Sequence, residues 1–183
     1  MSRIGKKLID LPKGVDIQIG KTSVTVKGPK GTLTQSIDPE MKITVDNGVL
    51  EVQRPSEQKR HKALHGLTRA LMSNMVTGVT EGFKREMELV GVGYRVANTG
   101  NLLEMSVGYS HPIMFAIPAE LKLETVTEKG QNPKIILSGS DNQLLGQICA
   151  KIRGMKAPEP FKGKGIKFSG EVIRRKAGKT AGK

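Results

Sequence analysis

The sequence predicts an α+β protein of two duplicated modules, each a small, mainly antiparallel sheet packed with one long helix. In each half of the chain, short runs of alternating apolar residues precede one stretch with helical spacing. The halves also align at an offset of about 84 residues, which places Ser56-Glu57-Gln58 opposite Ser140-Asp141-Asn142. We therefore expect an N-terminal module over residues 1–82 and a C-terminal module over residues 83–183.

Five short strands are predicted in the first module. Alternating apolar residues bounded by turn residues place them at residues 17–19, 24–26, 33–37, 42–45 and 49–52. Gly20-Lys21 separates the first two runs, and Gly28-Pro29-Lys30-Gly31 forms the next turn. The clearest hairpin signal is Asp46-Asn47-Gly48, because an Asn-Gly pair adopts positive φ angles at low cost.

A long helix is predicted after these strands. One apolar face is expected to point inward, made of Leu64, Leu67, Leu71 and Met75. Ser56 is the predicted N-cap, with Glu57 at the positive end of the helix dipole. We expect Gly78 or Gly82 to end the helix.

The second module repeats this plan. Strands are predicted at residues 86–90, 95–99, 102–107, 113–116, 121–126 and 134–137. A helix is expected to start at Ser140 or Asp141 and to stop at Gly154. Its inward face is expected to comprise Leu144, Leu145, Ile148 and Ile152.

The positive charge is concentrated at the two ends of the chain. The net charge is +13, of which residues 1–30 carry +5 and residues 151–183 carry +9, so the middle is nearly neutral. A solvated surface normally mixes charges of both signs, whereas this layout is typical of a surface that binds phosphates. The alternative is a disordered basic tail that serves solubility.

A loop over residues 158–168 is the strongest candidate for that surface. Prolines 158 and 160 stop the preceding helix, and Gly163 and Gly165 are expected to let the backbone approach a phosphate chain closely. Phe161 or Phe168 either stacks on a base or pins the loop to the domain, and pinning is favoured. The residues predicted to bind RNA are Arg153, Lys156, Phe161, Lys162, Gly163, Lys164, Gly165, Lys167, Arg174, Arg175, Lys176 and Lys179, with Arg3, Lys6 and Lys7 near the N-terminus.

Other classes of function lack support in the sequence. Cys149 is the only cysteine, so neither a disulfide nor a Cys-rich zinc site is expected. His61 and His65 have the spacing of a metal pair on a helix but lack a third ligand. No nucleophile, base and oxyanion donor assemble, so we expect neither an enzyme nor a cofactor. We also expect no secretory signal, membrane span or membrane-binding helix, which favours the cytoplasm.

These residues resemble the bacterial large ribosomal subunit protein six family. Its signature Pro-Glu-Pro-Tyr-Lys-Gly-Lys-Gly matches residues 158–165, except that Phe161 replaces the tyrosine. Further matching blocks follow in family order at residues 2–7, 26–31, 90–95, 108–112, 146–147 and 152–153. The sequence departs from the family pattern at Leu8, where proline is usual, and at Cys149, where alanine is common.

The resemblance implies a structural role in the large ribosomal subunit. It implies binding to large-subunit rRNA, chiefly through the C-terminal domain, near the sarcin–ricin loop and the stalk base where translational GTPases dock. Neighbouring ribosomal proteins at the stalk base are the expected protein partners, with no membrane and no small-molecule substrate. From the residues alone, the alternative is a non-ribosomal basic RNA-binding module.

Overall fold

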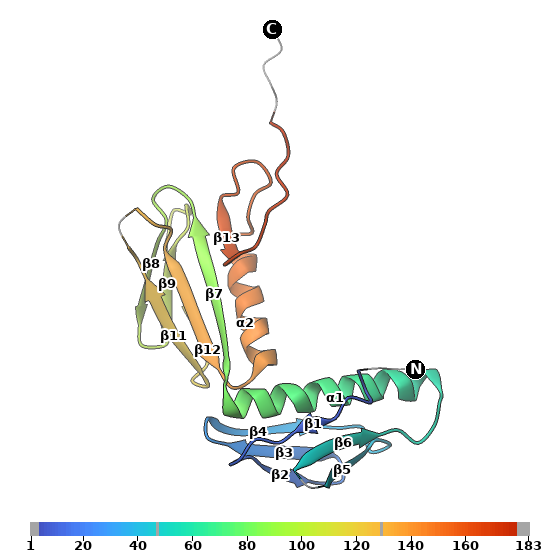
Figure 1. Ribbon diagram of the computed structural model, residues 1–183. Coiled ribbons are helices and arrows are strands. Elements are labelled where there is room, and N and C mark those ends of the chain that lie inside the picture. Colours follow the sequence, from blue (N-terminus) through green and yellow to red (C-terminus); the bar gives the residue numbers. More distant parts are fainter. Residues whose placement is uncertain (1–3, 47, 129, 179–183) are drawn as a thin grey trace. The chain divides into compact units, whose positions relative to one another are not determined.

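The computed structural model describes residues 4–46, 48–128 and 130–178. The chain forms two compact units, one of Met1–Phe83 with Ser140–Asn142 and the other of Lys84–Gly139 with Gln143–Lys183. Each unit combines antiparallel strand pairs with one long helix, so the predicted α+β fold class is confirmed (Figure 1). No helix of the described residues has the length and apolar character needed to cross a membrane.

The N-terminal unit contains two three-stranded sheets and helix α1. The strands are β1 (Ile9–Asp10), β2 (Asp16–Ile19), β3 (Ser23–Gly28), β4 (Gly31–Ser36), β5 (Lys42–Asp46) and β6 (Val49–Gln53), followed by α1 (Lys59–Thr80). The sheets have the orders β1-β6-β5 and β2-β3-β4, and α1 lies across them in Figure 1. All five predicted strands are confirmed, whereas the two-residue strand β1 was not predicted.

The buried face of α1 differs from the predicted one. The buried residues are His65, Thr68, Met72, Met75, Val76, Gly78 and Val79. Leu67 is 55% exposed, so its predicted inward position is wrong. The buried His65 is the cause of the shift: its Nε2 donates to the Val52 carbonyl over 2.7 Å, and Arg54 Nη1 lies 2.8 Å from its Nδ1. Because these hydrogen bonds satisfy its imidazole, His65 can lie in the core, where the apolar spacing predicted Leu67 instead.

The ends of α1 confirm one prediction and correct another. Gln58 is the N-cap and makes no side-chain cap bond. The predicted cap Ser56 is therefore wrong, and its hydroxyl instead accepts from the Gln58 amide at 3.3 Å and lies 2.7 Å from His61 Nδ1. At the other end, Gly82 has φ 75° and its amide donates to Thr77, so Gly82 ends the helix.

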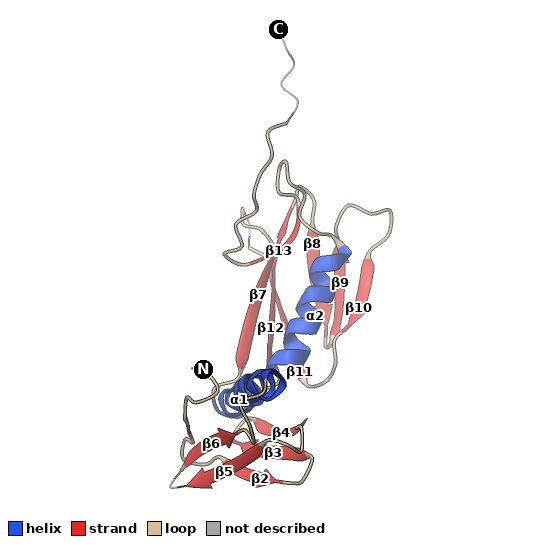
Figure 2. Cartoon of the chain, turned by 90° about the vertical axis from the view of Figure 1, so that its right-hand side faces the viewer, coloured by secondary structure: helices blue, strands red, loops and turns tan. Residues whose placement is uncertain are grey.

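The C-terminal unit repeats this strand order. Its elements are β7 (Phe83–Val90), β8 (Arg95–Thr99), β9 (Leu102–Ser106), β10 (Ile113–Ala116), β11 (Leu121–Val126), β12 (Lys134–Gly139), α2 (Asn142–Met155) and β13 (Gly165–Phe168). Its sheets have the orders β10-β9-β8 and β11-β12-β7-β13, and Figure 2 shows α2 running alongside these strands. When β1 to β6 are matched in order with β7 to β12, the strand orders of the two units are the same apart from the added β13. This agreement confirms the predicted duplication.

Helix α2 follows the sequence more closely than α1. Its buried residues are Leu145, Ile148, Cys149 and Ile152, so three of the four predicted inward residues are buried and Leu144 is half-buried. The helix continues one residue past the predicted stop at Gly154. Burial of Cys149 raises the pKa of its thiol, in keeping with a small core residue.

Strand β13 was not predicted. The segment expected to be a loop up to Phe168 pairs antiparallel with β7 from Gly165 onward, with Ile166 opposite Leu89. Ile166 is fully buried, so its apolar side chain adds to the backbone pairing with β7 in holding the strand on the sheet. Four residues that include a glycine and a lysine give too short an alternation to identify a strand. The strand fixes one end of the basic loop.

Candidate nucleic-acid interface

The basic loop is closed by its own backbone. The Ile166 amide donates to the Lys156 carbonyl over 2.7 Å, and the Glu159 amide donates to the Lys164 carbonyl over 2.9 Å. Between these bonds the chain displays Lys162 and Lys164, both exposed. A loop closed in this way holds its charges with little further loss of conformational entropy on binding.

The two glycines of the loop have different surroundings. Gly165 has φ 145°, and a Cβ there would lie 2.6 Å from Pro158 Cα and 2.7 Å from the Ala157 carbonyl oxygen. Glycine at position 165 is therefore required by contact with the chain's own backbone. Gly163 has φ 74°, and the nearest atoms to a Cβ there belong to Arg175, 3.8 Å away. Close approach of the backbone to phosphate at these two glycines stays a prediction.

Two tyrosine rings contact lysines in the basic loop and just before it. Lys156 Nζ lies 4.2 Å above the Tyr109 ring, and Lys164 Nζ lies 5.2 Å above the Tyr94 ring. The Tyr109 hydroxyl also donates to the Met155 carbonyl at the end of α2, over 3.1 Å. These contacts orient two cations outside α2 without neutralising them.

Sequence reasoning placed Tyr94 and Tyr109 in the matching blocks 90–95 and 108–112 but missed their contacts with the lysines. Tyr109 lies 49 residues and Tyr94 64 residues before Pro158, where the loop begins, and they are the only tyrosines in the chain. Their rarity and their place in those two blocks were the available signals. Burial raises the pKa of Tyr94, with smaller contributions from Glu159 and Tyr109.

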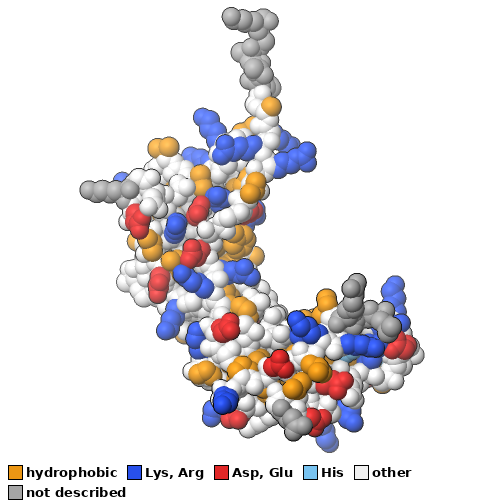
Figure 3. Space-filling view, viewed as in Figure 1, with side chains coloured by type: hydrophobic (Ala, Val, Ile, Leu, Met, Phe, Trp, Pro, Cys, Tyr) orange, Lys and Arg blue, Asp and Glu red, His pale blue; other side chains and the backbone are white. Residues whose placement is uncertain are grey.

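The tail runs back along the loop. The Lys176 amide donates to the Pro160 carbonyl over 2.8 Å. Arg174, Arg175 and Lys176 are all exposed, and Figure 3 shows Lys and Arg side chains gathered around the base of the tail. Tail and loop together therefore present five exposed cations, called here the loop–tail cluster: Lys162, Lys164, Arg174, Arg175 and Lys176.

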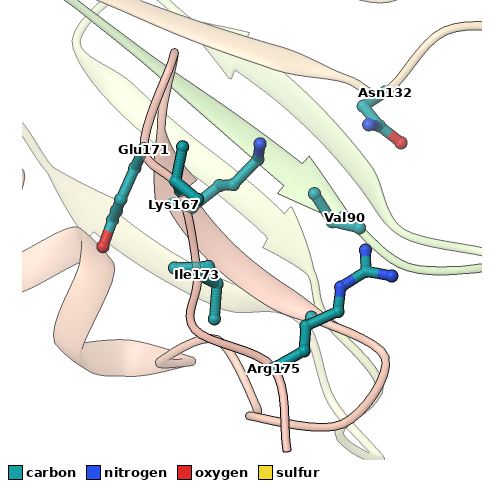
Figure 4. Close-up of a pocket in the computed structure, with 8 residues that line it drawn as sticks. Val90, Asn132, Lys167, Glu171, Ile173 and Arg175 are labelled. Carbon is teal, nitrogen blue, oxygen red and sulfur yellow. The ribbon is translucent and has the colours of Figure 1, made fainter.

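A cavity of about 350 Å³ lies between the tail and the sheet. It is lined by Val90, Asn132, Gly163, Lys167, Glu171, Val172, Ile173 and Arg175. Lys167 and Arg175 extend toward Val90 in Figure 4, whereas Glu171 points the other way, toward α2.

Two of the predicted RNA-binding cations are paired with carboxylates. Arg153 Nη2 lies 2.6 Å from Glu171 Oε1, and Lys167 Nζ lies 3.4 Å from Glu88 Oε2. Both lysine and arginine side chains are only partly exposed. Their first role in the folded chain is therefore structural, which the linear sequence did not indicate.

Phe161 is 53% exposed, so its burial gives the favoured interpretation, pinning of the loop, little support at this residue. Pinning comes instead from Ile166 in β13, next to the half-buried Phe168. An exposed aromatic ring beside Lys162 has the geometry for stacking on a base or ribose.

The predicted residues near the N-terminus belong to the other unit. Lys6 and Lys7 are exposed there, and Arg69 Nε donates to the Lys7 carbonyl over 3.1 Å. Arg3 and Lys179, also predicted to bind RNA, lie outside the described residues. The loop–tail cluster is thus built from the C-terminal unit alone.

The described residues contain no group of three or more His, Cys, Asp or Glu side chains able to hold a metal ion. His61, one of the two histidines at helical spacing, instead places Nε2 2.9 Å from the Glu40 carboxylate. What the site offers chemically is positive charge, backbone and aromatic surface.

Comparisons with known proteins match the whole chain. The family model for ribosomal protein L6 matches residues 11–82 and again residues 90–169. The large ribosomal subunit protein uL6 of Parabacteroides distasonis is 58% identical over 183 residues, which span all of both chains. The proteins of the same name from Cytophaga hutchinsonii and Carboxydothermus hydrogenoformans are 56% and 53% identical, over all of this chain and at least 98% of theirs.

Proposed function

Since the chain belongs to the ribosomal protein L6 family, we propose that it is a structural protein of the large ribosomal subunit that binds large-subunit rRNA. The C-terminal module, residues 83–183, makes the main contacts through the loop–tail cluster. The site on the RNA lies near the sarcin–ricin loop and the stalk base, beside the ribosomal proteins there. The chain holds RNA in shape for docking translation factors, without catalysis, in the cytoplasm.

The observation that carries this proposal is the arrangement of the loop–tail cluster. Two lysines on a loop closed by backbone bonds lie beside three cations of a tail bonded to the same loop. Lysines supply point charges to phosphates, and the forked guanidinium of Arg174 or Arg175 suits two phosphate oxygens at once. Each contact releases counterions from the RNA, which makes binding favourable and sensitive to salt.

The experiment compares two variants with equal loss of charge. In the first, all five residues of the loop–tail cluster are changed to Gln. In the matched control, five exposed lysines of the N-terminal unit are changed to Gln: Lys13, Lys21, Lys27, Lys42 and Lys59. A truncation of residues 151–183 is unsuitable because it removes part of α2 and all of β13.

Binding is measured in two ways. Affinity for purified bacterial large-subunit rRNA is expected to fall by several orders of magnitude in the cluster variant and far less in the control. A tagged chain expressed in a bacterium is expected to sediment with large subunits, and the cluster variant to stay at the top of the gradient. Equal losses in the two variants, or sedimentation of the wild-type chain apart from large subunits, would contradict the proposal.

A further inference from the structure

Glu171 is one of only two acidic residues in the basic segment 151–183, and three donors hold it. Arg153 approaches its carboxylate with both Nη2, at 2.6 Å, and Nε, at 3.2 Å. The Phe168 amide donates to Glu171 Oε2 over 3.0 Å. A two-point arginine contact combined with a backbone donor is among the strongest local arrangements for a carboxylate.

These bonds tie the start of the tail to two different elements. Arg153 lies in the last turn of α2, and Phe168 is the last residue of β13. The side chains of Arg153 and Glu171 are 33% and 25% exposed, so the pair is partly shielded from water. The hydrogen bonds to Arg153 and to the Phe168 amide lower the pKa of Glu171, and Glu171 raises that of Arg153. The contact is therefore ionic at neutral pH.

The Glu171 amide also donates to the Phe168 carbonyl over 3.0 Å, but the residues that follow are held by few contacts. Val172 is 93% exposed, and Ile173 is only half-buried. The next backbone bond is that of Lys176 to Pro160, on the far side of the tail arginines. Arg174 and Arg175 therefore lie between two tethers, and the Glu171 side chain is the one that joins the start of the tail to α2.

We propose that Glu171 is a positioning residue for RNA binding, which holds the tail arginines beside the basic loop by its contact with Arg153 and the Phe168 amide. This inference rests on the proposed function. Two expectations for the RNA affinity after removal of Glu171 then have opposite signs. Charge alone predicts that removing an acidic residue from an RNA-binding surface tightens binding, whereas positioning by Glu171 predicts that it weakens binding.

The control for this inference is Glu159, the other acidic residue of the segment. Glu159 lies in the loop, where its backbone amide bonds to Lys164. Glu159→Gln and Glu171→Gln change the net charge equally. Affinity for purified bacterial large-subunit rRNA is expected to fall about tenfold in Glu171→Gln, because the freed tail must be ordered on binding. In Glu159→Gln it is expected to stay level or rise.

A second comparison shows whether Glu171 acts through the tail. In a full chain that already carries Arg174→Gln, Arg175→Gln and Lys176→Gln, adding Glu171→Gln is expected to cause no further loss. Amide heteronuclear NOE values of residues 172–176 are expected to fall in Glu171→Gln while those of β13 stay unchanged. A general structural defect would instead weaken binding in both backgrounds and lower the values throughout the unit.

Should Glu171→Gln fail to fold, Arg153→Lys takes its place, since it keeps both charges but cannot make the two-point contact. It is expected to weaken binding several-fold. Unchanged affinity in Arg153→Lys, or affinity of Glu171→Gln equal to or above that of Glu159→Gln, overturns the inference while the proposed function stands. Failure of the wild-type chain to bind this RNA overturns both.

Discussion

Substitution of Gly165 by alanine is expected to destabilise the C-terminal unit strongly. The residue has φ 145°, and a new Cβ would meet Pro158 Cα at 2.6 Å and the Ala157 carbonyl oxygen at 2.7 Å. An alanine held at such a φ costs about 1–3 kcal/mol. Both obstacles are backbone atoms, so the chain must shift, at about 1–3 kcal/mol for an overpacked site. We expect a loss of roughly 2–6 kcal/mol, a large share of the total stability of a domain.

The assay is urea unfolding followed by tyrosine fluorescence. Tyr94 and Tyr109 are the only tyrosines, the chain has no tryptophan, and both tyrosines lie in the C-terminal unit, so the signal reports on that unit alone. The matched control is Gly163→Ala, whose Cβ meets nothing closer than 3.8 Å. Only the left-handed φ then costs free energy, about 1–2 kcal/mol. A Gly165→Ala chain as stable as Gly163→Ala would refute the reasoning.

Three further predictions concern the core and the Glu171 contact. Met72→Ala is expected to cost about 2–5 kcal/mol and Leu67→Ala under about 0.5 kcal/mol in urea unfolding followed by circular dichroism; equal costs would mean that the buried face of α1 is misassigned. His65→Leu is expected to cost about 1–3 kcal/mol in the same assay because the Val52 carbonyl loses its donor, and a gain in stability would contradict this. In an NMR titration, the pKa of Glu171 is expected below 4.5 and is expected to rise in Arg153→Gln, so the stability from this contact is present above pH 4.5 and is lost as the pH falls through the lowered pKa. An unchanged midpoint in that variant would show that Arg153 is not the partner that lowers it.

The sequence was sufficient for the elements that depend on local periodicity. Alternation and turn glycines identified every strand longer than four residues, because a half-buried strand has apolar and polar side chains in alternation along the sequence. The buried face of α1 was predicted incorrectly because the hydrogen bonds that bury His65 are made to Val52 and Arg54, which lie outside the helix. Strand β13 depends on a partner, β7, about 80 residues earlier in the chain, and such pairing has no local signal.

The candidate site was predictable in its charge and less so in its construction. Composition and spacing located the exposed cations, because the excess of Lys and Arg near the C-terminal end can be counted in the sequence without knowledge of the fold. The roles of Arg153 and Lys167 depend on Glu171 and Glu88, which only the fold brings near. Gly165 illustrates the same limit: the sequence shows that a side chain is absent there, and the fold shows which atoms require its absence.

The most direct test of RNA binding by the loop–tail cluster is the salt dependence of its affinity for large-subunit rRNA. With about six phosphates contacted, the logarithm of the association constant is expected to fall against the logarithm of the salt concentration with a slope of roughly −4 to −5. Changing the five cations of the cluster to Gln leaves about one such contact and is expected to reduce the slope to roughly −1. A wild-type slope near zero, or the same slope in both chains, would contradict the account.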